Sequence, residues 1–121
     1  MRLAWLMMLS LLVPAAAFAK RAPPKEVPPV VHEGVEYRFP HFGYLEEEGQ
    51  NGGIVEAHDQ RTGKLLWRLK VYAPSRAPGL EGDVQEVFIT SARLEGNKLA
   101  IANERGERYE VDLATRTVRK R

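Results

Sequence analysis

Apolar side chains at alternate positions are the feature that most constrains how this 121-residue chain can fold. Leu65, Trp67, Leu69 and Val71 follow this pattern in residues 64–72, and a similar run covers residues 109–113. A period of two places side chains on one face of a β-strand. Because turns rich in Gly, Asp and Asn separate the runs, the sequence predicts an all-β fold, an antiparallel meander of short strands.

The expected strands and loops follow from these runs. No segment beyond residue 19 has a helical period. Within residues 64–72 we expect Leu65, Trp67, Leu69 and Val71 on one face, and Arg68, Lys70 and Tyr72 on the other. Long loops are expected over residues 40–53 and 73–83. The expected strands are Val30–Phe39 (an edge strand, or a hairpin around Gly34), Ile54–Asp59, Lys64–Tyr72, Val87–Leu94, Lys98–Asn103, Glu107–Leu113 and Thr117–Arg119.

The N-terminus has the organisation of a secretory signal peptide. Arg2 supplies the positive charge, residues 3–13 form a short apolar run, and Ala17-Phe18-Ala19 is a small-residue cleavage site. The apolar run is short for a membrane-spanning helix, so an uncleaved anchor is the weaker alternative. We therefore expect cleavage after Ala19, a secreted or periplasmic protein, and no membrane insertion afterwards. Four prolines predict an extended arm over residues 20–29, and residues 30–121 are expected to form a single all-β domain.

Composition excludes several kinds of site. The chain has no cysteine, so disulfides, thiol nucleophiles and thiolate metal sites are impossible, and a hydrophobic core must hold an exported domain together. The formal net charge is +2, and it falls further without Arg2. Such a balanced chain lacks the positive field that nucleic-acid binding requires, so no nucleic-acid partner is expected.

A turn motif stands out between two of the expected strands. Asp59 is expected to accept hydrogen bonds from backbone N–H groups of the turn, and the Thr62 hydroxyl to do likewise. Gly63 is expected to adopt a positive φ that returns the chain into the next strand. Trp67 is expected to share a face with Leu65 and Leu69, as a packing anchor between one sheet and its neighbour.

Six positions of this stretch (Ala57, Asp59, Thr62, Gly63, Lys64 and Trp67) form the pattern A-x-D-x-x-T-G-K-x-x-W, which resembles the repeat of pyrroloquinoline-quinone-type β-propellers. A weaker copy has Asp112 and Thr115 at the corresponding positions, with Arg116 in place of the glycine and Lys120 in place of the tryptophan. The resemblance implies about one and a half blade-like units: a single blade-like sheet with an extra hairpin. A closed propeller needs four to eight blades. We therefore expect an independent domain and no cofactor, with a ring of several copies as the alternative.

Candidate chemical groups are few. His32, His41 and His58 lack a short metal-ligand spacing, so a metal site requires the fold to bring them together. Glu81, Asp83 and Glu86 offer oxygen ligands without the full pattern of a calcium loop. No serine lies in a G-x-S-x-G motif, and we expect no catalytic residue.

These observations favour a secreted or periplasmic binding module whose partner is an envelope or secreted protein. Loops on a rigid scaffold commonly carry binding residues. We therefore expect contacts from Phe42 and Tyr44 in one loop and from Arg76 and Leu80 in the other. The alternative is a small metal-binding protein or enzyme that uses the three histidines and nearby carboxylates. The oligomeric state is left open.

Overall fold

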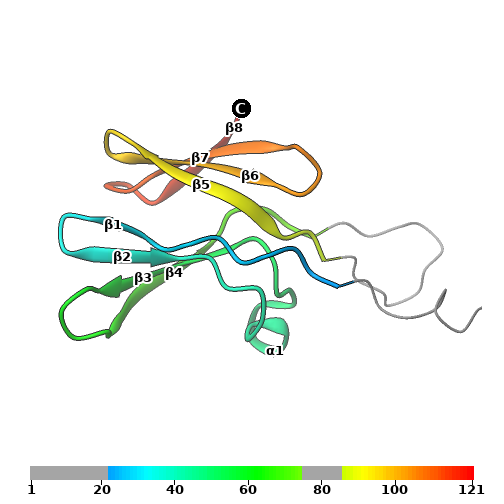
Figure 1. The fold of residues 1–121 in the computed structure, drawn as a ribbon, viewed down its shortest axis with the longest axis horizontal. Coiled ribbons are helices and arrows are strands. Elements are labelled where there is room, and N and C mark those ends of the chain that lie inside the picture. The colour runs from blue at the N-terminus through cyan, green and yellow to red at the C-terminus, as the bar shows by residue number, and fades with distance from the viewer. Residues whose placement is uncertain (1–21, 75–85) are drawn as a thin grey trace, which may run out of the picture.

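The computed structural model describes residues 22–74 and 86–121, which form two four-stranded antiparallel sheets and one short helix. Figure 1 shows the two sheets lying one above the other. The first sheet contains β1 (Val30–His32), β2 (Val35–Arg38), β3 (Ile54–Asp59) and β4 (Leu65–Lys70), in that order. The expectation of an all-β antiparallel meander is confirmed.

The second sheet repeats this arrangement. Its strands are β5 (Ile89–Glu95), β6 (Lys98–Asn103), β7 (Arg108–Asp112) and β8 (Thr117–Lys120), again in consecutive order. The helix α1 (Leu45–Glu48) is a single turn within the long β2–β3 connection and was not expected from the sequence. The helix was missed because a single turn is too short to produce a helical period in the sequence.

The expectation of a single blade-like sheet with an extra hairpin is wrong, because the described residues build two four-stranded sheets. Residues 30–38 form the hairpin that was considered, and β2 pairs with β3 from Val35↔Asp59 to Arg38↔Glu56. This pairing was missed because a long connection, residues 39–53, separates the two strands in the sequence. No local pattern reports pairing across such a distance.

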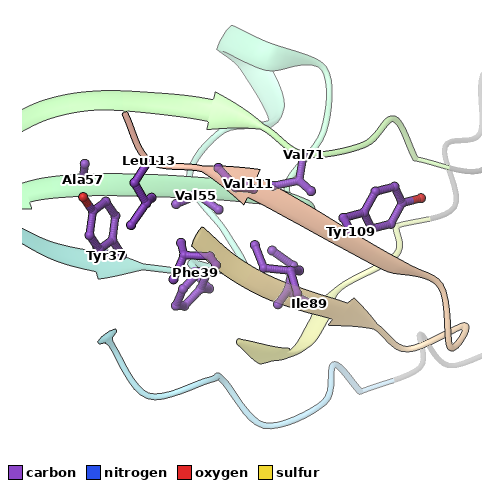
Figure 2. Packing of buried hydrophobic residues seen from close by; sticks show 11 residues of the cluster. Tyr37, Phe39, Val55, Ala57, Val71, Ile89, Tyr109, Val111 and Leu113 are labelled. Atoms are coloured by element: carbon purple, nitrogen blue, oxygen red, sulfur yellow. The ribbon is translucent and has the colours of Figure 1, made fainter. Parts of the chain in front are cut away.

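One hydrophobic core fills the space between the sheets. Val55 and Ala57 of β3 and Val111 of β7 are fully buried in it. Figure 2 shows these side chains, together with Tyr37, Phe39, Ile89 and others, pointing into the shared interior. The outward faces are polar: on β7, Glu110 lies 3.1 Å from Arg119 and 3.6 Å from Lys98. The molecule is therefore a two-layer sandwich with both apolar faces turned inward.

The alternation in β4 departs from the expectation at both ends. Ala57 pairs with Trp67 but the next residue, His58, pairs with Leu65, so one extra residue lies on β4 between the two pairs. Such a bulge turns Leu65 to the outer face, where it is 40% exposed, while Trp67 remains against the core. At the other end Tyr72, expected on the outer face, packs against the core after the strand has ended.

The described part of the proline-rich arm lies against the sandwich. Val27 packs on the core cluster, and the Glu26 carboxylate accepts a hydrogen bond of 3.4 Å from the His41 backbone N–H. The predicted signal peptide and cleavage site lie outside the described residues. Within residues 22–74 and 86–121, no helix is long and apolar enough to cross a membrane.

Candidate functional site

The connection between β2 and β3, residues 39–53, is here called the Phe42 loop. Its backbone is tied at several points. The side-chain oxygen of Asn51 accepts hydrogen bonds from the N–H groups of Gly43 (3.2 Å) and Tyr44 (3.3 Å). The Gln50 side chain, 2% exposed, donates to the carbonyls of Gly52 (2.9 Å) and Tyr72 (2.8 Å). The loop is therefore held as one ordered unit.

Tyr44 anchors this loop to the outer face of the first sheet. It is 8% exposed, and its hydroxyl donates a hydrogen bond to the Glu56 carboxylate on β3. The Arg68 guanidinium of β4 lies 5.0 Å from the centre of the Tyr44 ring. Burial, and then the hydrogen bond and the charge of Glu56, raise the pKa of Tyr44 to about 12. Tyr44 therefore stays a neutral donor at physiological pH.

Glu56 also contacts a histidine on its own strand. The His58 ring places Nε2 2.9 Å from the second Glu56 oxygen and Nδ1 3.1 Å from the Gly63 carbonyl oxygen. Because Glu56 and His58 are two residues apart on β3, their side chains share the outer face. The result is a continuous chain of contacts from the β3–β4 turn to the Phe42 loop.

Ion pairs hold α1 against β4. Arg68 lies 2.6 Å from Glu47 and 2.9 Å from Glu48, and Lys70 lies 3.5 Å from Glu48. These groups are partly exposed, so each pair contributes little to stability by itself. Together they fix the position of the helix over the strand.

The end of the loop is locked to the segment before β5. The Glu86 carboxylate accepts hydrogen bonds from the N–H groups of Asn51 (2.9 Å) and Gly52 (3.0 Å). A Cβ atom at Gly52 would lie 2.4 Å from the Val87 carbonyl oxygen, so only glycine fits this close approach. Glu86, considered as a calcium ligand, is thus bound to the protein's own backbone, and its proposed companions Glu81 and Asp83 lie outside the described residues.

Two large apolar side chains project from this braced loop. Phe42 is 59% exposed and Leu45 is 54% exposed. The Phe42 ring contacts the buried rings of His41 (6.4 Å between centroids) and Phe88 (6.0 Å) edge-on. An exposed aromatic ring is therefore held in one place by buried rings behind it.

The residues predicted for binding and for metal have different surroundings. Phe42 is exposed and Tyr44 is buried, while Arg76 and Leu80 lie outside the described residues. The three histidines do not converge. His32 lies 3.8 Å from Glu33, His58 contacts Glu56 and Gly63, and His41 is 2% exposed against Phe88. Among the described residues, no group of three or more His, Asp or Glu side chains is placed to hold a metal ion.

The Asp59 turn has the expected geometry. The Asp59 side chain accepts hydrogen bonds from the N–H groups of Arg61 (2.8 Å) and Thr62 (3.0 Å), and Gly63 has a φ of 79°. The Thr62 hydroxyl accepts a hydrogen bond of 3.2 Å from the Lys64 N–H. The backbone hydrogen bonds, first from Thr62 and then from Arg61, lower the pKa of Asp59.

The second copy of the turn keeps this geometry despite its altered sequence. Asp112 accepts hydrogen bonds from the N–H groups of Ala114 (2.9 Å) and Thr115 (3.0 Å). Arg116, at the position of the glycine, has a φ of 61°. Its guanidinium lies 5.0 Å from the centre of the Trp67 ring in the other sheet. The two turns thus have equivalent geometry, and Arg116 of the second turn contacts Trp67 on β4 of the other sheet.

Sequence reasoning missed the importance of Glu56 and Asn51. Glu56 was detectable, because it lies two residues before His58 on a predicted strand and shares its face. Asn51 gave no signal, since its partners are backbone groups whose positions depend on the folded loop.

A search against models of known protein families gave no match, and neither did a search of curated proteins. The likeness to the quinone-type propeller repeat therefore has no family match behind it. It rests on the sequence pattern and on the geometry of the two turns.

Proposed function

We propose that this chain is an exported binding module that recognises an envelope or secreted protein through the Phe42 loop. The observation that carries the proposal is the presentation of Phe42: its ring is 59% exposed, yet it rests on the buried rings of His41 and Phe88. Interfaces draw much of their binding energy from a few aromatic side chains near their centre. Phe42 has the exposure and the support that such a residue needs.

The bracing of the loop favours binding for an energetic reason. Ordering a flexible loop on association costs free energy, which reduces affinity. Asn51, Gln50 and Tyr44 already hold the Phe42 loop in the free protein. Leu45, 54% exposed three residues after Phe42, adds a second apolar contact. The partner surface is therefore expected to be apolar, with a recess that accepts an aromatic ring.

Site-specific cross-linking tests this proposal. Residues 20–121, carrying photoreactive benzoylphenylalanine in place of Phe42, are incubated with an envelope extract of the source cell and irradiated. We expect a discrete cross-linked protein that is absent when the same group replaces Leu65, which is 40% exposed on another part of the molecule. The Phe42→Ser variant, used as an unlabelled competitor, is expected not to suppress the adduct, whereas the wild-type chain does. Equal cross-linking from both positions, or none from position 42, contradicts the proposal.

We further infer that the two sheets are propeller-blade-like units paired in a self-contained monomer. The equivalent turns at Asp59 and Asp112 support a common repeat. The polar outer face of the second sheet argues against stacking of further copies, because Glu110 and its partners Lys98 and Arg119 would lose their hydration. Light scattering is expected to give the mass of one chain. A mass of several chains would favour the ring instead.

A further inference from the structure

Both ring nitrogens of His58 face oxygens that accept hydrogen bonds. Nδ1 lies 3.1 Å from the Gly63 carbonyl oxygen, and Nε2 lies 2.9 Å from a Glu56 carboxylate oxygen. A neutral imidazole has one donor and one acceptor, whereas both of these oxygens accept. Both contacts can be hydrogen bonds only if the His58–Glu56 pair holds an extra proton, either on the second ring nitrogen or on the carboxylate.

The same carboxylate holds the Phe42 loop. Its other oxygen accepts the hydrogen bond from the Tyr44 hydroxyl, and the Tyr44 side chain is the part of the loop buried against β3. Without the extra proton, a lone pair of the ring faces either the Gly63 carbonyl or the Glu56 carboxylate. The resulting repulsion displaces Glu56 or His58 and weakens the contact that positions Tyr44.

The charged groups that face the His58–Glu56 pair come from the neighbouring strands. On β2, Glu36 pairs with His58 in the sheet register and Arg38 pairs with Glu56, while the Arg38 guanidinium lies 2.5 Å from the Glu36 carboxylate. On β1, Val31 pairs with Glu36, and on β4, Leu65 pairs with His58. Both of these side chains are uncharged.

The nearest cation on β4 is already engaged elsewhere. Arg68 pairs with Glu56 in the register, but its guanidinium contacts Glu47 and Glu48 of α1. The His58 ring, 9% exposed, is therefore flanked by its partner Glu56 and by Glu36, whose charge Arg38 offsets.

We propose that His58, Glu56 and Tyr44 form a pH-sensitive clasp that fixes the Phe42 loop while the pair holds its extra proton and loosens as the pH rises and the proton leaves. Histidine is the side chain that commonly changes its charge between about pH 5 and 8. The clasp therefore ties the order of the loop to the acidity of the compartment. As a regulation of binding it rests on the function proposed above, but the clasp itself can be tested with no partner present.

Amide exchange of the isolated protein measures the clasp. The N–H groups of Glu48 and Gly49 bond to the carbonyls of Tyr44 (2.8 Å) and Leu45 (3.0 Å), so their exchange reports opening of this part of the loop. We expect their protection, corrected for intrinsic exchange, to fall about tenfold between pH 5.5 and 8, the effect of losing one charge-assisted hydrogen bond. The ¹⁵N signals of the His58 ring should change over the same pH range, from two protonated nitrogens to one.

Matched variants identify the group responsible. His58→Gln should abolish the pH dependence, while His32→Gln, a change at the partly exposed histidine beside Glu33, should preserve it. Glu56→Gln should loosen the loop throughout the range. If His58→Gln does not fold, the wild-type ring signals still decide, because they must move together with the loop amides.

The proposal is overturned if wild-type protection does not change with pH, if the dependence survives in His58→Gln, or if it disappears in His32→Gln. A clasp that titrates as expected, together with no cross-linking from position 42, would refute the binding function alone.

Discussion

Replacement of Trp67 by alanine tests whether the cross-sheet contact stabilises the sandwich. Trp67 packs against the core from β4, with the Tyr37 ring 5.8 Å away and the Arg116 guanidinium 5.0 Å away. Tyr37 belongs to the same sheet, whereas Arg116 lies in the β7–β8 turn of the other. The variant therefore removes contacts within one sheet and between the two sheets.

The expected loss follows from the area and the ring contacts. A fully buried indole removes about 200 Å² from water, worth about 5 kcal/mol, but Trp67 is only half-buried and alanine retains part of the contact, so about 2 kcal/mol is lost. The contacts with Tyr37 and Arg116 add roughly 0.5 kcal/mol each. The sum of about 3 kcal/mol corresponds to a fall in Tm of about 12–24 °C for a domain of this size.

Urea and thermal unfolding followed by circular dichroism measure this loss. Leu66→Ala is the control, because Leu66 lies on the same strand but is 48% exposed, and its loss is expected to stay within about 0.5 kcal/mol. A double-mutant cycle of Trp67→Ala with Arg116→Ala isolates the cross-sheet contact, with an expected coupling of about 0.5 kcal/mol. A loss below 1 kcal/mol for Trp67→Ala would refute the role of the indole as a packing anchor.

Three further outcomes are expected. Gly52→Ala should destabilise the protein by about 2 kcal/mol in urea unfolding, because the new Cβ would meet the Val87 carbonyl oxygen at 2.4 Å; an unchanged midpoint would refute this packing. The pKa values of Asp59 and Asp112 are lowered in the folded state, so their stabilisation is present at neutral pH and is lost as the pH falls below about 4. Changing both residues to Asn should reduce the loss of stability at low pH. If the variant loses as much stability as the wild type, other carboxylates are responsible. His41→Leu should leave Tm unchanged or raise it, because the buried Nε2 of His41 has no hydrogen-bond partner among the described residues; a drop of several degrees would indicate one.

The strands were predictable because each is specified by its own residues. The predicted bounds of β3, Ile54–Asp59, and of β6, Lys98–Asn103, agree with the structure. In β7, Tyr109 and Val111 face the core as their alternation requires. Local patterns carry this information because the side-chain period of a strand and the chemistry of its turns need no knowledge of distant residues.

The features that escaped prediction depend on contacts between distant segments. The bulge that turns Leu65 outward arises from the pairing of β4 with β3, and no property of residues 64–72 reveals it. The candidate site behaves in the same way. Phe42 was singled out as a loop aromatic, but the burial of Tyr44 under Glu56 and Arg68 depends on the loop folding back over two strands.

Arg116 shows how a residue that is unfavourable in a turn can be partly offset by the fold. Judged by the turn alone, an arginine with a φ of 61° is a worse choice than the glycine at position 63, by about 1 kcal/mol. Glycine, however, has no side chain to reach across the sandwich. The Arg116 guanidinium lies 5.0 Å from the centre of the Trp67 ring, and this contact recovers about 0.5 kcal/mol while joining the two sheets. Arg116 thus serves the packing of the sheets as well as the turn, and Arg116→Gly should raise the overall stability by about 0.5 kcal/mol while abolishing the coupling of this position to Trp67.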